Sequence, residues 1–171
     1  MNSEYATSGA LGTKRGLFSN YRMQVTLAHI GAPIRGSDGY GALADSYLAR
    51  STSFTRCEGE SFRSEAAFFD WLSRRQGRTT ALAILLDSRG RQMTSEGFAE
   101  WLREVRDSGT QHVVFAIGPA DGWTAEGLKH AHMRLALGQF TMAHGLARLV
   151  MAEQIYRAST ILSGHPYHTG H

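Results

Sequence analysis

The sequence predicts an α/β fold with a largely parallel sheet, because apolar stretches typical of strands alternate with segments of helical periodicity. Two of these stretches, 81–86 and 112–117, are continuously apolar, as expected of strands that helices cover on both faces. The 171 residues are enough for one domain with a proper core and too few for two comfortable ones. In such sheets, ligands bind beyond the carboxyl ends of the strands.

The first half of the chain gives the weaker pattern. Residues 23–30 read as a strand, and glycines and a proline then mark a loop up to residue 39. Helical spacing of apolar residues predicts helices over 40–50 and 62–75. Between them we expect a weak strand at 53–57.

The second half is clearer. The strand at 81–86 is expected to end in a turn at 87–90, and Thr94 or Ser95 can cap a helix that runs to Arg106. Three more elements follow the strand at 112–117: a short helix at 124–130, a brief strand at 134–137 and a final helix at 144–162.

Composition limits the class of protein. No apolar run is long enough to cross a bilayer, and residues 1–22 lack the apolar middle of a secretory signal. We therefore expect a cytoplasmic protein in which residues 1–22 form a flexible extension and residues 23–171 form one domain. The single cysteine, Cys57, cannot form an intramolecular disulfide, and we interpret it as a small buried hydrophobe.

The positive charge is small and comes almost entirely from arginine. The net charge is +3 and the sequence pI is about 9.3. Arginine binds phosphate in a two-pronged geometry that lysine cannot reproduce, although genome composition explains the bias equally well. Such a charge favours contact with a large preassembled nucleic-acid partner over tight binding to naked RNA.

The final helix and the tail after it carry the most suggestive side chains. Glu153 and Arg157 are spaced i, i+4, so they can pair, either as a structural ion pair at a subunit interface or to hold the arginine for a phosphate or a developing anion. His165, Tyr167 and His168 follow, and we expect them to transfer protons or contact RNA, with an unstructured tail as the alternative. No cysteine or carboxylate accompanies the histidines, so we predict no metal site. Apolar residues on two sides of this helix predict that it packs against two bodies, such as the sheet and a second subunit.

Two strand ends offer further candidates. Gly118 and Gly122 bracket a loop after a buried strand, where glycine lets the backbone approach a ligand; a plain turn is the alternative. The spacing is not that of the dinucleotide-binding fingerprint. Asp87 follows the other buried strand, and we interpret it as the cap of a turn.

Five segments occur together in one order, and in combination they resemble the bacterial ribosomal RNA large subunit methyltransferase H family, the small single-domain branch of the SPOUT methyltransferases. The resemblance is strong from residue 81 to 168, thin from 23 to 80 and absent before residue 23. The segments that carry it are Leu86-Asp87, Phe115 to Gly122, Leu137 to His144, Glu153 to Ala158 and Gly164 to His168.

This resemblance implies a trefoil-knotted α/β fold and a homodimer whose sites lie near the subunit interface. It also implies methylation of N3 of a pseudouridine in 23S ribosomal RNA, on the assembled ribosome, with S-adenosylmethionine as cofactor. By the family pattern, the catalytic residues facing the RNA are Arg157, His165, Tyr167 and His168. The cofactor pocket is lined by Leu86, Gly118, Leu137, Gly138, Gln139, Phe140, Thr141 and Met142.

The chemistry of the reaction suggests roles for the tail. The methyl group must be placed in line with the acceptor nitrogen, whose proton must also leave. We hypothesise that His168 or His165 assists proton loss and that Arg157 supports the resulting anion.

The chain departs from the family at one informative position. Pro119 stands where the family has a second glycine, and proline has no N–H to offer a cofactor. Two alternatives therefore stay open. The chain is either a degenerate homologue that binds ribosomes or RNA without catalysis, or a SPOUT enzyme retargeted to another RNA through its divergent first half.

Overall fold

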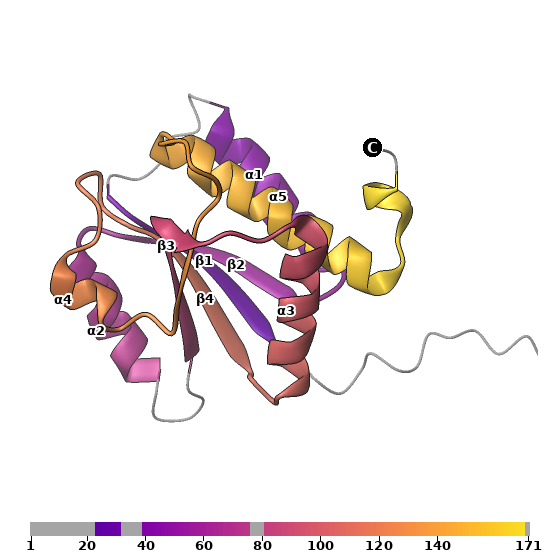
Figure 1. Ribbon diagram of the computed structural model, residues 1–171, viewed down its shortest axis with the longest axis horizontal. Coiled ribbons are helices and arrows are strands. Elements are labelled where there is room, and N and C mark those ends of the chain that lie inside the picture. The colour runs from indigo at the N-terminus through magenta and orange to yellow at the C-terminus, as the bar shows by residue number, and fades with distance from the viewer. Residues whose placement is uncertain (1–22, 32–38, 76–80, 170–171) are drawn as a thin grey trace, which may run out of the picture.

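The structure is a computed structural model that describes residues 23–31, 39–75 and 81–169. Across these residues the fold is a parallel sheet of five strands in the order β2-β1-β4-β3-β5 (Figure 1). The predicted extension, residues 1–22, lies outside the described residues. The strands are β1 (Gln24–Ile30), β2 (Arg56–Phe62), β3 (Ala81–Arg91), β4 (His112–Ile117) and β5 (Met133–Leu135).

Helices cover both faces of the sheet, as the apolar strands predict. Figure 1 shows helices on both sides of the sheet. One layer holds α2 (Glu65–Arg75) and α4 (Ala125–Leu128). The opposite layer holds α1 (Tyr40–Ser51), α3 (Ser95–Asp107) and α5 (His144–Ser163), and a short 3₁₀ helix, η2 (Pro166–His168), follows α5.

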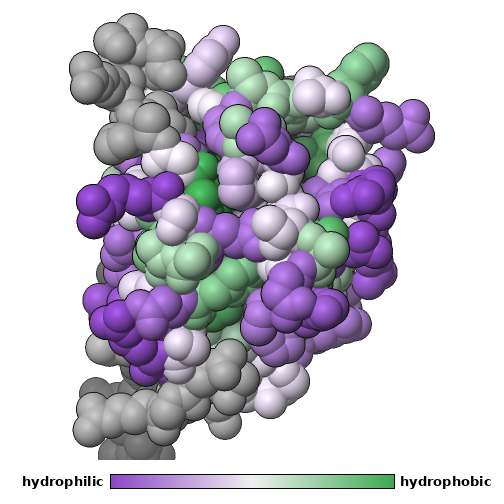
Figure 2. Space-filling view, turned by 90° about the vertical axis from the view of Figure 1, so that its left-hand side faces the viewer, coloured by the Kyte–Doolittle hydropathy of each residue, from purple (hydrophilic) through white to green (hydrophobic). Residues whose placement is uncertain are grey.

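Each layer has its own apolar core. Phe68 and Leu72 of α2 pack on one face of the sheet, while Leu48, Leu102 and Met151 pack on the other. Where the outer side of the α2 and α4 layer meets solvent, Figure 2 shows apolar surface gathered between hydrophilic side chains. No helix among the described residues combines the length and apolarity that a membrane span requires.

The second strand lies later in the chain than predicted. Residues 52–55 form turns after α1 instead of a strand, and β2 then pairs along its whole length with β1. Phe62 belongs to this strand, opposite Ile30, so its helical spacing to the residues of α2 was misleading. Periodicity failed here because β2 is an edge strand with polar residues on its exposed side.

The predicted turn at 87–90 is wrong as the end of a strand, because β3 runs on to Arg91. Leu86 and Arg91 both pair with Leu135, so the residues between them form a bulge within the strand. Gly90 makes this possible: a Cβ on it would lie 2.6 Å from the carbonyl carbon of Arg134 in β5. The bulge brings the backbone of β5 against β3 without ending the strand.

Cys57 behaves as the sequence indicates. Its side chain is buried in β2, and burial raises the pKa of its thiol to about 12. The thiol therefore stays protonated and apolar in character at neutral pH.

Candidate functional site

A cavity lies at the carboxyl edge of the sheet, where α/β folds bind ligands. It has a volume of about 180 Å³ and is walled by the ends of β3, β4 and β5 and by the first turn of α5. It brings together seven of the eight residues proposed for the cofactor and leaves out Gln139. Those seven are Leu86, Gly118, Leu137, Gly138, Phe140, Thr141 and Met142.

Trp123 organises this cavity, although the sequence analysis did not single it out. Its indole Nε1 donates a hydrogen bond to the backbone carbonyl of Leu86 at 2.9 Å. A Cβ on Gly118 would lie 2.8 Å from the Trp123 ring, so residue 118 must be glycine to admit the indole. The available signal was a tryptophan placed directly after Gly122, in a loop at a strand's carboxyl end.

The loop after β4 accommodates its proline. The backbone N–H of Gly122 donates to the carbonyl of Pro119 at 2.9 Å, which closes a tight turn. Gly122 supplies the positive φ, +83°, that proline could not adopt. Pro119 therefore costs the loop one N–H but leaves its backbone path intact.

The segment after β5 is also open to a ligand. Gly138 has φ +145°, and among the described residues nothing lies within 4 Å of the position of its Cβ, so its backbone is open to the cavity. Apolar side chains of Leu86, Ile117 and Leu137 face the same cavity. Apolar walls with exposed backbone groups suit an adenine nucleoside, so these residues fit S-adenosylmethionine.

Asp87 does not cap a strand-ending turn, as the sequence suggested, but hydrogen-bonds to Arg89 within the bulge of β3. Its carboxylate accepts from the backbone N–H of Arg89 at 2.8 Å and from the guanidinium of the same residue. These bonds from Arg89 hold the pKa of Asp87 below its ordinary value. Asp87 also borders the cavity, where it is an ionised group with its charge already paired.

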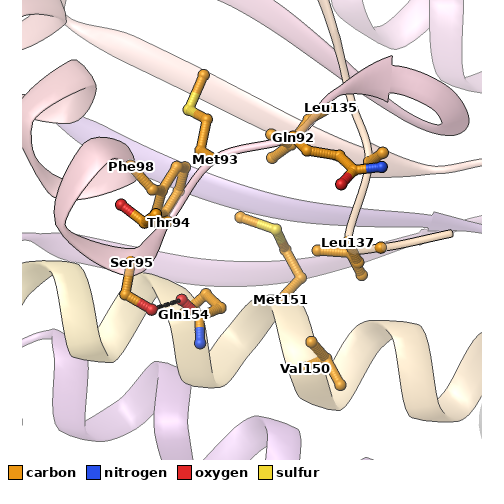
Figure 3. A pocket seen from close by; sticks show the side chains of 12 residues that line it. Gln92, Met93, Thr94, Ser95, Phe98, Leu135, Leu137, Val150, Met151 and Gln154 are labelled. Carbon is orange, nitrogen blue, oxygen red and sulfur yellow. Dashed lines mark hydrogen bonds between the residues drawn. The ribbon is translucent and has the colours of Figure 1, made fainter.

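A second cavity, of about 330 Å³, adjoins the first through Leu135, Leu137 and Gly138. Figure 3 shows side chains from β5, from the loop before α3 and from α5 around it, and Ser95 donates to the amide oxygen of Gln154 at 2.8 Å. The hollow at the sheet edge therefore continues along α5.

Two of the proposed catalytic residues, Arg157 and Tyr167, meet at Glu153 in the middle of α5. Arg157 donates to Oε1 of Glu153 through Nε at 3.0 Å and Nη2 at 2.7 Å, and the Tyr167 hydroxyl donates to the same oxygen at 3.1 Å. The hydrogen bonds from Glu153 raise the pKa of Arg157. Burial, together with the contacts to Tyr47 and Glu153, raises the pKa of Tyr167 as well, so the tyrosine stays a protonated donor.

Aromatic side chains anchor the tail to α1. Tyr156 is buried between Tyr167, with ring centroids 4.8 Å apart, and Arg50, which lies 4.1 Å above its ring and donates to its hydroxyl at 2.9 Å. Phe54 meets both Tyr156 and His165 at ring distances of 6.2 and 6.3 Å. The tail up to Thr169 is therefore packed against α5 and its neighbour. Sequence reasoning missed Arg50 because nothing local signals a partner a hundred residues away.

The two tail histidines are held in different tautomers. Nδ1 of His165 accepts from the backbone N–H of Tyr167 at 3.2 Å, so in the neutral ring the proton sits on Nε2. Nδ1 of His168 contacts the carbonyl of His165 at 3.1 Å and must donate, which leaves Nε2 as an acceptor. In this arrangement His168 can accept a proton and His165 can donate a hydrogen bond.

The cavity and the catalytic cluster do not meet within one chain. Ala147 borders the cavity, and Arg157 follows ten residues later on the same helix. At 1.5 Å per residue this is a separation of about 15 Å along the helix axis. No group of three or more potential metal ligands occurs among the described residues.

Comparison with known proteins agrees with the resemblance. The family model described as "Predicted SPOUT methyltransferase" matches residues 23–168. "Ribosomal RNA large subunit methyltransferase H" of Koribacter versatilis (strain Ellin345) is 47% identical over 129 residues, which are 75% of this chain and 88% of that protein. The protein of the same name from Sinorhizobium medicae (strain WSM419) is 50% identical over 88 residues, 52% of this chain and 55% of its own length.

Among solved structures, the SpoU methyltransferase AviRb from Streptomyces viridochromogenes in complex with AdoMet is 11% identical, with a TM-score of 0.49 over 85% of this chain and 60% of that one. The assignment therefore rests on the sequence matches. On these, the chain belongs to the SPOUT methyltransferase family, which confirms the predicted α/β methyltransferase class and S-adenosylmethionine as the cofactor.

Proposed function

We propose that this protein is a ribosomal RNA methyltransferase that methylates N3 of a pseudouridine in 23S ribosomal RNA on the assembled ribosome, as a cytoplasmic homodimer. The observation that carries the proposal is the cavity at the sheet edge, because segments far apart in sequence converge there on groups that suit an adenine nucleoside. The relative from Koribacter, aligned over most of its length, gives the RNA class.

The separation of the two clusters supports the dimer. Arg157 does not line the cavity and lies about 15 Å along α5 from Ala147, which does, so a methyl group held in the cavity does not contact its own chain's Arg157. A second copy with its α5 antiparallel would bring its tail to the first copy's cavity. A half-buried stripe is available for this packing, because Leu149, Val150 and Glu153 of α5 are only partly covered.

The cofactor supplies the methyl group as a sulfonium, and this chain's residues supply the rest. Nε2 of His168 takes the N3 proton of the base, since Nδ1 is committed to the carbonyl of His165. Nε2–H of His165 and the guanidinium of Arg157 donate to the anion that forms. Glu153 and Tyr167 position Arg157 and do not exchange protons with the base.

Methyl transfer to ribosomes tests the proposal. Purified protein, labelled S-adenosylmethionine and ribosomes from a strain lacking this gene should give one methylated pseudouridine in 23S RNA, mapped by mass spectrometry. Methylation of a different RNA would indicate a retargeted enzyme. Ribosome binding without transfer, when the cofactor also fails to bind, would indicate the degenerate homologue instead.

A further inference from the structure

His29 is a buried polar side chain that the fold does not explain. It lies at the carboxyl end of β1 and is 2% exposed. Among the described residues its Nδ1 has no hydrogen-bond partner. A buried polar atom is normally paired, so an unpaired one in a protein that binds a small molecule indicates a missing ligand atom or bound water.

The ring of His29 faces the start of α5. His144 is the first residue of this helix, and the two imidazoles are perpendicular, with centroids 6.1 Å apart. His144 also lines the cavity proposed for the cofactor. His29 therefore lies behind the wall of that cavity, at the helix end that borders it.

The N-terminal end of α5 favours the binding of a negatively charged group. Ala143 occupies the N-cap position, has no side chain able to cap, and the first turn contains no acidic residue. The first N–H groups of a helix have no partner inside it, and they carry the positive end of the helix dipole. Arg148, one turn further on, carries a positive charge, and its Nη2 donates to Oδ1 of Asp45 at 2.6 Å.

The state of His29 fits a hydrogen-bond donor to an anion. Burial, followed by the charges of His144 and Arg148, lowers the pKa of His29, so the ring is neutral at neutral pH. A neutral imidazole still offers one N–H. It can bind an oxyanion without burying a second cation.

We propose that His144 and the first N–H groups of α5 form the binding site for the carboxylate of the methyl donor, and that His29, buried behind His144, joins this site through a bound water. This rests on the proposed cofactor cavity and deepens it by naming the end of the cavity that holds the amino-acid part. S-Adenosylmethionine carries a single carboxylate, remote from its adenine. The glycine loops at the strand ends suit the nucleoside, and the start of α5 suits the carboxylate.

Two ligands that differ in the carboxylate test the assignment. S-Adenosylhomocysteine retains the amino acid, and 5′-methylthioadenosine lacks it. By isothermal titration calorimetry, His144→Ala should weaken S-adenosylhomocysteine about tenfold, the usual effect of a lost hydrogen bond to a charged group, and leave 5′-methylthioadenosine within twofold. His29→Ala should do the same, and His144 is only half-buried, so its variant keeps the inference testable should His29→Ala unfold.

The matched control is His130→Ala, which replaces an exposed histidine just after α4 and should change neither affinity. Equal losses for both ligands in the His144 variant, or no loss for either, would overturn the carboxylate site while leaving the cavity in place. If the unaltered protein binds neither ligand, the cavity assignment itself fails, and the carboxylate site fails with it.

Discussion

At the scale of single residues, the two tail histidines differ by which nitrogen is already bonded. His168 keeps Nε2 free as an acceptor, whereas His165 presents Nε2–H. We expect His168→Ala to slow single-turnover methylation of ribosomes by about 10²- to 10⁴-fold, the range for loss of a general base. His165→Ala should slow it less. The reverse order would contradict the tautomer assignment, and unchanged rates for both would end the proposed role of the tail.

A buried histidine outside the proposed site, His112, contributes to stability against acid. His112 is buried in β4, and its Nε2 donates to Thr26 at 2.9 Å, which in turn donates to Glu58. Burial lowers the pKa of His112 below the ordinary value near 6.5. The unfolded chain therefore binds its proton more readily than the folded chain. The free energy of unfolding is retained above that ordinary pKa and falls as the pH drops through it.

Urea unfolding between pH 7.5 and 5.5 measures this effect. His112→Gln should flatten the pH dependence, because glutamine keeps a donor for Thr26 but does not titrate. His132→Gln is a suitable comparison, since His132 already accepts from a backbone N–H through Nδ1. An equally steep dependence in the His112 variant would show that another group is responsible.

At the scale of elements, the bulge in β3 decides how β5 joins the sheet. Gly90→Ala would place a Cβ 2.6 Å from the Arg134 carbonyl carbon, so β5 must shift away from β3. We expect the free energy of unfolding to drop by about 2 kcal/mol, as for other overpacked sites. The cofactor should also bind more weakly, because Leu135 at the end of β5 and Leu137 just after it line the cavity. Arg91→Ala, at an exposed position on the same strand, is the control; equal stability of the two variants would contradict the model of a tight β3–β5 contact.

The long helix also shows what a periodic pattern does and does not indicate. Its apolar residues on two sides predicted two packing partners, and within the chain they meet the sheet, α1 and α3. Tyr156 is covered by Arg50 of α1 and by Tyr167 of the tail, so intrachain partners account for part of that surface. The remaining half-buried stripe carries the dimer proposal.

At the scale of the whole molecule, the position of the two clusters makes a distinct prediction. His168→Ala damages the tail, and Gly138→Val damages the cavity because it places a β-branched residue at φ +145°. In a mixed dimer of these two variants, one of the two composite sites combines an intact cavity with an intact tail. We expect each variant alone to be inactive and the purified mixed dimer to regain about half the activity of the unaltered protein. A site contained within one chain would give no recovery, because every chain is then damaged. The half-activity estimate assumes two independent sites.

Much of this architecture followed from local pattern. The buried strands β3 and β4 were predicted from continuous apolar runs, and α3 from its periodicity and the Thr94 cap, which accepts from the Gly97 N–H. The edge strand β2 was misplaced because polar, half-exposed residues leave little periodic signal. The trefoil knot implied by the resemblance stays a prediction, since strand order alone does not define how a chain is threaded.

The sequence by itself determined the α/β class, the family and the segments that converge on the cavity. The apolar runs and helical periodicities that predict strands and helices lie within short stretches of sequence, and the family motifs occur in one order along the chain. The tertiary structure decided that Trp123 donates to the carbonyl of Leu86 and that Nδ1 of His29 has no partner among the described residues. It also decided that Arg157 and Tyr167 meet at Glu153, away from the cavity at the start of α5. These facts depend on contacts between residues far apart in the chain, and no local pattern records which distant side chain fills a given space.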